Sequence, residues 1–531
     1  MKRKENIKNA LVIIFLIIVA TVFGLPALAQ LIDRTQNPNT AGAGIAKSLP
    51  QQIGAGRGDV MTPDSSSFII ARDPFRSIRR GRQLFQRKFL RIQGLGPTTN
   101  DSVGDLDREL ALSAGLADSC ATCHGRPRGS AGFGGDVATR PDSRDAPHLF
   151  GLGIKEMLAD EITADLRAIR AEAIARAQQT HHDVTRVLTS KSIQYGRITA
   201  RSNGTVDTTQ ISGVDADLRV KPFFHHGDTA SIHEFVVGAF NDEMGMQAVD
   251  PELMAAHNGG RYVTPTGMVL DGSKDFVKAP PTDNPSEDVD GDGIANEIPA
   301  SLVDHMEFYL LNYFKPATYE QTQATQRGGE LFQQVGCAQC HIPNLRINRD
   351  RRVADVETVY DEEHGIFNNL FATANPLFNV INDTSGFPAF KKPKLQPFLA
   401  QNIFTDFKRH DLGANFHERD YDGTIRTKFM TTPLWGVGST SPYGHDGRSI
   451  TLKEVILRHG GEAQAARDAF ARLQPAGQRR IIEFLDSFVI FPPDDTASTL
   501  DPGNPLTPGF PQFGHGSIRL PVLFNNPNDP E

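Results

Sequence analysis

Cysteine and tryptophan are scarce in this chain, with four and one among 531 residues. All four cysteines fall within two short motifs, so none is left over for other pairings. An excess of positive charge is also lacking: the formal net charge is −8, which excludes a global basic surface for nucleic acid. The apolar fraction of 39% is ample for buried cores. The length predicts two to four domains, and the presence of two cysteine motifs favours two.

One motif, C-x-x-C-H, occurs twice, at residues 120–124 and 337–341. It is the attachment pattern of c-type haem, in which two thiols bond to the porphyrin and the adjoining imidazole binds the iron. The alternatives are two disulfides, a zinc site or a thioredoxin-like pair. Zinc ligands are expected at closer separations, and a redox pair does not require His after both second cysteines. The sequence therefore predicts two covalently bound haem c groups, held by Cys120, Cys123, His124, Cys337, Cys340 and His341.

The first 29 residues have the pattern of a secretory signal peptide. Three basic residues precede an apolar run from Ala10 to Leu25, and an A-x-A sequence ends at Ala29. An uncleaved membrane anchor is the alternative, but this run is shorter than the about 20 residues that a span needs. We therefore expect cleavage after Ala29, a periplasmic bacterial protein and no stable membrane span after cleavage. Export agrees with covalent haem attachment, which takes place outside the bacterial cytoplasmic membrane.

The predicted fold class is mostly α, with two cytochrome-c-like haem domains, long loops and few short strands. A weak internal repeat supports two such units, because G-R-Q-L-F at residues 81–85 and G-G-E-L-F at 328–332 each precede a C-x-x-C-H motif. A long amphipathic helix is expected from Ile154 to about Ser190. The expected divisions are a signal peptide (1–29), a flexible lead-in (30–67), an N-terminal haem domain that is the candidate peroxide site (68–275), an acidic linker (276–300), a C-terminal electron-transfer haem domain (301–491) and a Pro- and Asn-rich tail (492–531).

The acidic linker contains the beginning of a calcium loop. Carboxylates alternate along D-V-D-G-D-G, as in the first half of an EF-hand loop. An EF-hand would carry Glu at position twelve, where Pro299 stands, so another segment would need to supply ligands. A solvated acidic turn is the alternative. The candidate calcium ligands are Asp288, Asp290, Asp292 and Asn296.

The segment from Thr432 to Glu462 carries the most specific pattern of the second half. It contains T-P-L-W-G, then H-D-G-R, and a histidine fourteen residues after the one that opens H-D-G. With these motifs the chain resembles bacterial di-haem cytochrome c peroxidases, and more closely a family of di-haem oxidoreductases described as peroxidases or thiol oxidoreductases. The resemblance extends from about Arg80 to Phe488. It implies one six-coordinate electron-transfer haem and one haem at which peroxide is reduced.

In that family the residue fourteen positions after the H-D-G histidine is the distal axial ligand, usually Met. Here it is His459, so the resemblance implies iron held by His341 and His459, with Met430 as the competing ligand. Two imidazoles should lower the reduction potential, because a Met ligand raises it. The resemblance also places His445 and Arg448 at the haem propionates or behind the iron ligands.

The pattern around the first haem is less complete. The family carries a helix D-G-R-x-x-S-L-E-E-Q and then Glu-Met above the iron, and residues 227–245 resemble that segment with Glu243 as the acid. Glu243 would shuttle the proton for peroxide cleavage. Phe235 replaces the motif's Gln, two residues are missing before Glu243, and Arg140 stands where the family has a removable distal histidine. The remaining candidates for a sixth ligand are His148, His225 and His226.

Three functions are compatible with these motifs. The leading hypothesis is a peroxidase in which electrons pass from the C-terminal to the N-terminal haem. The others are an electron-transfer cytochrome without substrate chemistry, and an oxygenase or protein-modifying oxidase on the same scaffold. The expected partners are hydrogen peroxide and a small electron-donor protein such as a cytochrome or cupredoxin. The family often places a tryptophan between the haems, whereas Trp435 lies in the C-terminal motif.

Overall fold

The computed structural model describes residues 48–96, 117–125, 131–134, 136–137, 144–313, 321–360, 370–419 and 423–489. Helices outweigh strands in these residues, which confirms the mostly α class. The strands are two to eight residues long and form sheets of two or three, and these sheets are more numerous than expected. The predicted signal peptide and C-terminal tail lie outside the described residues. Within the described part, no helix is long and apolar enough to cross a membrane.

A close crossing of two helices organises the first half of the chain. Helix α4 (Pro74–Gln86) packs across α9 (Ala300–Asn312). The helices approach most closely at Gly81, where a Cβ atom would lie 2.2 Å from the carbonyl oxygen of His305 and 2.4 Å from the Cβ of Tyr309. Only glycine allows this approach, since packed interiors leave no space for an extra carbon.

A crossing of the same kind organises the second half. Helix α10 (Gln323–Gln334) packs across α13 (Pro475–Asp486). Here the close approach is at Gly328, where a Cβ atom would lie 1.9 Å from the carbonyl oxygen of Arg480 and 2.7 Å from the Cβ of Phe484. The two glycines occupy the same position of the predicted sequence repeat, so that repeat has a structural counterpart.

The two crossings show where helix α9 packs, a helix that the predicted domain boundary at residue 301 assigns to the second unit. In each half, a glycine-bearing helix precedes a C-x-x-C-H motif and is crossed by a later helix that closes the unit. Helix α9 therefore closes the first unit, whereas the sequence interpretation made it the start of the second. Its residues Leu302, Met306 and Tyr309 are fully buried in the first core, which explains this membership.

The lead-in predicted to be flexible is packed from residue 48 onward. It contains α2 (Leu49–Ile53) and the start of α3 (Ser66–Arg72). Between these helices, the Arg57 guanidinium lies 2.7 Å from the carboxylate of Asp250 and 2.8 Å from that of Asp304. Both carboxylates are fully buried, so they need this cation, and the local composition of the segment does not reveal the partnership.

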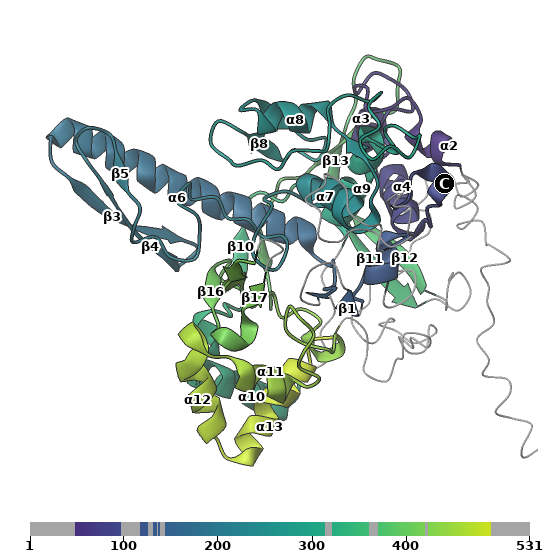
Figure 1. Cartoon of the computed structure of the whole chain (residues 1–531). Helices are drawn as coiled ribbons and strands as arrows, with labels where there is room; N and C mark the ends of the chain where they lie inside the picture. Colours follow the sequence, from purple (N-terminus) through teal and green to yellow (C-terminus); the bar gives the residue numbers. More distant parts are fainter. Residues whose placement is uncertain are drawn as a thin grey trace, which may run out of the picture.

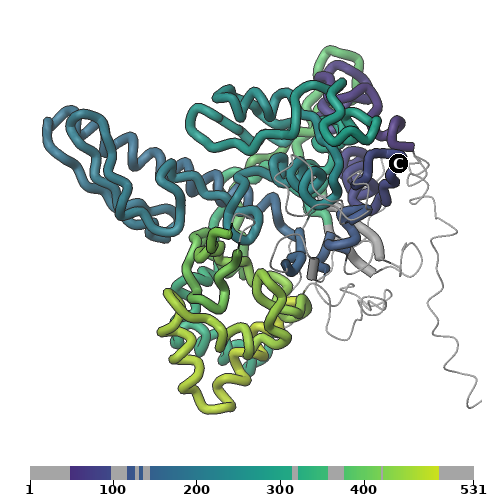
Figure 2. The backbone as a smooth tube through the Cα atoms, viewed as in Figure 1, coloured from purple at the N-terminus to yellow at the C-terminus, as the bar shows by residue number. Residues whose placement is uncertain are grey.

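An arm projects from the body of the molecule (Figures 1 and 2). It consists of α6 (Leu152–Thr180) and the antiparallel strands β3 (Val184–Ser190), β4 (Ile193–Ala200) and β5 (Val206–Asp207). The helix that was expected to continue to about Ser190 ends at Thr180. The last part of the expected helix instead forms β3, which pairs with β4 and covers the outer end of α6.

The base of the arm lies against both units. Ile162 and Leu166 of α6 belong to a buried cluster that also contains Leu345, Phe407 and Trp435 from the second half of the chain. Helix α6 also contacts α7 and α9 of the first unit. One continuous helix therefore links the two units.

The other elements are short and cover these units. The helices are η4 (Arg91–Gln93), α5 (Cys120–His124), α7 (Ile232–Met244), α8 (Pro251–His257), η5 (Cys337–Gln339), η6 (Ala414–Phe416), η7 (Val437–Ser439), α11 (Leu452–Arg458), η8 (Gly461–Ala463) and α12 (Gln464–Arg472). The strands are β1 (Asp136–Val137), β2 (Arg144–Asp145), β6 (Ala248–Val249), β7 (Arg261–Val263), β8 (Val269–Asp271), β9 (Ile298–Pro299), β10 (Leu345–Ile347), β11 (Ala354–Tyr360), β12 (Leu370–Pro376), β13 (Phe378–Ile381), β14 (Phe390–Pro393), β15 (Phe398–Ala400), β16 (Arg409–Asp411), β17 (Glu418–Arg419), β18 (Ile425–Arg426) and β19 (Lys428–Met430). Strands β6 and β9 pair in parallel.

Candidate functional site

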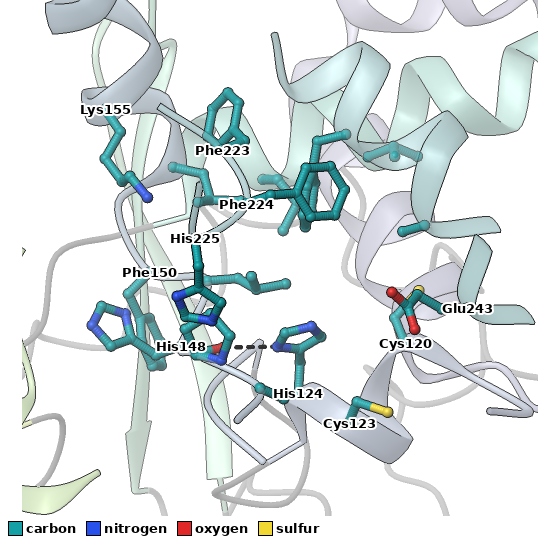
Figure 3. Close-up of a pocket in the computed structure, with 18 of the residues that line it drawn as sticks. Cys120, Cys123, His124, His148, Phe150, Lys155, Phe223, Phe224, His225 and Glu243 are labelled. Carbon is teal, nitrogen blue, oxygen red and sulfur yellow. Dashed lines mark hydrogen bonds between the residues drawn. The ribbon is translucent and has the colours of Figure 1, made fainter. Parts of the chain in front are cut away.

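The first C-x-x-C-H motif forms the short helix α5 at the edge of a cavity (Figure 3). Cys120, Cys123 and His124 all line this cavity. Its walls are mainly apolar and come from α4, α6, α7 and α9, with the side chains Phe85, Leu152, Phe240, Met306 and Leu310. The motif therefore opens into a space whose lining suits the flat apolar face of a porphyrin.

His124 is oriented by one hydrogen bond. Its Nδ1 donates to the carbonyl oxygen of Pro147 at 2.7 Å, the bond drawn as a dashed line in Figure 3. Burial lowers the pKa of His124 to about 4, so the imidazole is neutral near pH 7. A proximal histidine has this arrangement, because a fixed Nδ1–H leaves the Nε2 lone pair available for iron.

The second motif lines a second cavity, to which Cys337, Cys340 and His341 all contribute. His341 donates from Nδ1 to the carbonyl oxygen of Phe404 at 3.0 Å. Burial lowers the pKa of His341 as well. Each of the two motifs thus presents a neutral imidazole whose Nδ1 is bound to a backbone carbonyl.

The predicted partner of His341 lies in the same cavity. His459 follows the last residue of α11, a helix that begins with a capping box between Thr451 and Glu454. Its Nδ1 donates to the carbonyl oxygen of Val455 at 2.6 Å, and burial lowers its pKa to about 4. The structure therefore brings together two imidazoles with the same orienting contact. Met430 also lines this cavity.

The two residues expected around the second haem are placed differently. His445 lines the second cavity, stacks on Phe429 with ring centroids 4.0 Å apart, and has its Nε2 3.5 Å from a carboxylate oxygen of Glu418. Arg448 does not line either cavity described here; its side chain is 55% exposed and lies 3.5 Å from Asp446. Burial and then the charges of Arg144, Arg458 and Arg448 lower the pKa of His445 to about 3. A role for Arg448 at the haem stays a prediction.

Buried polar residues that the sequence interpretation did not identify also lie near the second cavity. Arg144 forms a buried ion pair with Glu418, the residue that faces His445. His410 lines the cavity and bonds to Asp406 at 2.9 Å and to Glu462 at 2.7 Å. Burial alone would lower the pKa of His410, but the bond to Asp406 and the neighbouring Cys340 thiol raise it. Of these residues only Arg144 has a local signal in the sequence, since it ends a run that contains four arginines between residues 125 and 144.

Glu243 lies in the last turn of α7 and lines the first cavity. Figure 3 shows its side chain at the cavity together with those of the first motif. Burial and the charge of Glu243 raise the pKa of the Cys123 thiol to about 11, which also reflects proximity to the motif. The predicted acid is therefore placed beside the predicted attachment site.

Lys155 is a further ionisable group of the first cavity, and the sequence interpretation missed it. Its ammonium lies 5.5 Å from the centre of the Phe223 ring. Burial lowers the pKa of Lys155 to about 8, close enough to neutrality for the amine to exchange protons. No local pattern distinguishes this lysine from the many that lie on the surface of a helix.

Two candidate sixth ligands of the first cavity, His148 and His225, form their hydrogen bonds through Nε2, whereas His124 forms its hydrogen bond through Nδ1. His148 donates from Nε2 to the carbonyl oxygen of Trp435 at 2.6 Å, and His225 from Nε2 to that of Asp145 at 3.2 Å. Both would have to bind iron through Nδ1, which lies beside the Cβ branch, where a porphyrin ring is hindered. His226 also lines this cavity.

The two cavities share a wall. Both are lined by the segment from Asp145 to His148, by His225, by the segment from Met430 to Pro433 and by Trp435. The bond from His148 to Trp435 lies within this wall, and the Trp435 indole Nε1 donates to the carbonyl oxygen of Gln401 at 3.2 Å. The only tryptophan of the chain thus lies between the cavities, although it was not expected there.

The four candidate calcium ligands are also placed. Carboxylate oxygens of Asp288, Asp290 and Asp292 lie within 4.8 Å of one another, and the Oδ1 of Asn296 is buried. This loop precedes β9 and does not line either cavity described above.

The donor sets of both cavities fit haem. Each offers two thiols and a neutral imidazole with its Nδ1 already bound, within a mainly apolar space. The described residues place no further metal ligands beside His124. Beside the second motif, ligand atoms of Cys340, Asp406 and His410 lie within 4.8 Å of one another. Zinc there would leave Cys337 and His341 without a role, whereas a C-x-x-C-H haem site uses both. The fold and the two sites together define a protein with two haem sites.

Comparison with known proteins agrees with that class. Residues 345–488 match the family described as "Di-haem oxidoreductase, putative peroxidase", which confirms the resemblance over this part of the chain. A solved structure of hydrazine synthase from Kuenenia stuttgartiensis, pressurised with xenon, aligns with 82% of this chain and 95% of its own at 12% identity, with a TM-score of 0.35. No curated protein sequence matches the chain.

Proposed function

We propose that this protein is an exported di-haem c-type cytochrome that reduces hydrogen peroxide. Peroxide would be reduced at the haem held by His124, with electrons arriving through the haem held by His341 and His459. The observation that carries the proposal is the difference between the cavities. In the second cavity His341 and His459 each donate from Nδ1 to a backbone carbonyl, which leaves Nε2 toward the cavity. In the first cavity His124 has this contact, and the carboxylate of Glu243 lines the same space.

The two haem units would have different roles, electron entry at the second and peroxide reduction at the first. Reduction of one peroxide molecule takes two electrons and two protons and yields two waters. The two electrons would come from the small electron-donor protein, and bound haem would relay them to the peroxide. Glu243 would hold and deliver a proton, because its carboxylate lines the cavity that contains His124. Pro147 would keep the His124 imidazole in the tautomer that leaves Nε2 free.

An electron-transfer cytochrome without substrate chemistry is the second candidate. His148 and His225 both line the first cavity, and either would close the site if it bound iron through Nδ1. Electron paramagnetic resonance of the oxidised protein separates the two functions. A high-spin signal from the His124 haem, present when oxidised or after half-reduction, is expected for the peroxidase. Two low-spin haems in both states would contradict it.

Replacing Glu243 by Gln tests the acid. We expect peroxide turnover to fall by about 10²-fold or more with haem content unchanged, the usual range for removing a general acid–base group. Asp242→Asn is the matched control, since Asp242 is the neighbouring acid, lies 2.9 Å from Lys278 and does not line the cavity. Turnover that is equal in the two variants would remove Glu243 from the mechanism.

Covalent attachment, export and the electron donor also belong to this proposal. The two C-x-x-C-H motifs support thioether bonds, and the pattern of residues 1–29 supports export to the periplasm. Haem that stays with the denatured polypeptide, and a mature N-terminus at Gln30, are the expected results. A small cytochrome or cupredoxin is the expected donor, to be tested by steady-state turnover with each reduced protein.

A further inference from the structure

The acidic loop before β9 contains an unusual buried carboxylate. Three carboxylates of the loop lie within 4.8 Å of one another, and the residue at position twelve is Pro299. The position that would complete a calcium loop is thus occupied by a residue without a side-chain oxygen. A carboxylate from elsewhere is required if the loop is to surround a cation.

Glu297 supplies such a carboxylate. It is 4% exposed, and neither of its carboxylate oxygens has a hydrogen-bond partner among the described residues. The Oδ1 of Asn296, the preceding residue, is likewise buried and without a partner. A buried carboxylate without a partner is costly, so such groups in proteins are normally paired or bound to a metal.

The charges of the loop act on Glu297. Burial, and then the carboxylates of Asp290 and Asp292, raise the pKa of Glu297 to about 8. The chain turns between the loop and Glu297. Two residues there have left-handed backbone angles, Gly293 with φ of 94° and Asn296 with φ of 55°. Asp290 and Asp292 are thus close enough to act on the buried Glu297 carboxylate, which comes two positions before the usual ligand.

We propose that residues 288–297 form a calcium site in which Glu297, at position ten, replaces the usual ligand at position twelve. Asp288, Asp290 and Asp292 supply three further carboxylates, and Asn296 supplies an amide oxygen. An all-oxygen set of this charge suits Ca²⁺, which accepts irregular geometry and six to eight ligands. Mg²⁺ demands a regular octahedron and retains water.

The loop is hydrogen-bonded to Gln247, which follows α7, the helix that contains Glu243. Gln247 accepts a hydrogen bond from the Val289 amide at 2.9 Å and donates to the Glu287 carbonyl at 2.6 Å. Strand β9, which follows Glu297, pairs with β6 directly after Gln247. Calcium would therefore restrain the chain between α7 and β6. This consequence does not depend on whether peroxide is the substrate.

Calcium titration of the full-length, haem-containing protein after chelation tests the site. We expect isothermal titration calorimetry to show one Ca²⁺ bound per chain and much weaker Mg²⁺ binding. Glu297→Gln should weaken Ca²⁺ binding by about tenfold or more, because the affinity of such loops follows ligand charge. Glu330→Gln is the matched control, since Glu330 is 61% exposed on α10, and its affinity should equal that of the wild type. Absence of Ca²⁺ binding in the wild type, or equal affinity in the Glu297→Gln variant, would overturn the proposal.

Thermal unfolding provides a second readout that does not need activity. Without calcium, Glu297→Gln should melt at or above the wild-type temperature, because it removes a buried unpaired carboxylate. With calcium the wild type should gain more than the variant. Asp290→Asn should lose the calcium effect as well. A melting temperature that calcium leaves unchanged in the wild type would contradict the site, whereas loss of peroxide turnover alone would bear only on the proposed function.

Discussion

The imidazole of His459 has a single contact that directs its chemistry. Its Nδ1 donates to the Val455 carbonyl, so only Nε2 is available in the cavity that also contains His341. His459→Met should therefore keep a six-coordinate haem and raise its reduction potential. The expected rise is on the order of 100 mV, a fraction of the roughly 0.8 V over which axial ligands tune haem. Potentiometric titration followed in the visible spectrum measures this shift.

The control for this change is His182→Met, because His182 is an exposed residue of the arm. Its haem potentials should equal those of the wild type. If His459→Met also leaves both potentials unchanged, His459 is not an iron ligand and Met430, which lines the same cavity, becomes the candidate.

His233 is a buried cation in the first core. It lies 2.6 Å from Asp250 and 2.8 Å from Glu307, and Arg57 also binds Asp250. Burial alone would lower the pKa of His233, but the two carboxylates raise it to about 10. The stability from its charge is therefore complete below the unfolded pKa of about 6.5 and is lost as pH rises toward 10. Each pH unit in that window should remove at most about 1.4 kcal/mol.

Thermal or denaturant unfolding between about pH 7.5 and 9.5 measures this effect. The range lies above the pKa of Glu156, which burial raises to about 7. Lys155 and Glu297, whose pKa values are about 8, titrate within the range, so the effect of His233 is measured as the difference in slope between the wild type and the His233→Gln variant. His233→Gln should be less stable at neutral pH by about 3–5 kcal/mol, because it breaks a buried charge network, and should show a shallower loss with pH. His257→Gln, which removes a bond to a backbone carbonyl, should keep the wild-type slope. Parallel slopes in all three proteins would show that His233 is uncharged.

At the scale of elements, two glycines determine how the helices cross. A methyl group at Gly81 would meet the backbone of α9, and one at Gly328 would meet the backbone of α13. Neither backbone can yield without separating the helices, so Gly81→Ala and Gly328→Ala should each cost about 1–3 kcal/mol or more. Chemical denaturation of the haem-containing variants measures the loss.

Gly238→Ala on α7 is the matched control for both variants. An added Cβ there would find its nearest atoms at 3.7 Å and beyond, an ordinary van der Waals distance. Alanine in a helix with room for it should be neutral or should stabilise by about 0.5–1 kcal/mol. Equal destabilisation of all three variants would mean that helix geometry, and not the close crossing, requires these glycines.

Local sequence patterns predicted where helices occur better than they predicted which elements pack against one another. The G-x-x-L-F repeats and both C-x-x-C-H motifs are short-range signals, so they could be predicted from sequence. The assignment of α9 to the first unit depends on its contact with Gly81, more than 200 residues earlier, which no local pattern contains. Strand β3 was mistaken for the end of α6 because its partner β4 lies beyond a two-residue turn at Lys191 and Ser192.

The same distinction applies to the sites. His124, His341 and His459 could be singled out because they stand in motifs with set spacing, and the structure places them at the two cavities. Glu297 could not, since it stands two positions away from the ligand that a calcium loop normally has. Lys155 owes its altered pKa to burial, a property of the tertiary structure. Residues such as Glu297 and Lys155, whose properties depend on burial and on neighbouring side chains, can be identified only from the tertiary structure.

On the scale of the whole molecule, the two units are joined through their cavities. The shared wall contains His148 and Trp435, which are bonded to each other, and α6 packs against both units. The Glu156 carboxylate of α6 adds a buried junction, because it binds Arg351 at 2.6 Å and accepts the amide of Ile232 at 2.7 Å. If one unit unfolded, the cavity of the other unit would lose part of its lining.

The two haem units should therefore unfold together. We expect one cooperative transition, with the same midpoint in the Soret absorption and in far-ultraviolet circular dichroism. Gly328→Ala makes the test sharp, because the added methyl group lies in the second unit only. It should lower the midpoint of the signal from the His124 haem as much as that from the His341 haem. A shift confined to the His341 haem would show that the units are independent and that their common wall contributes little to stability.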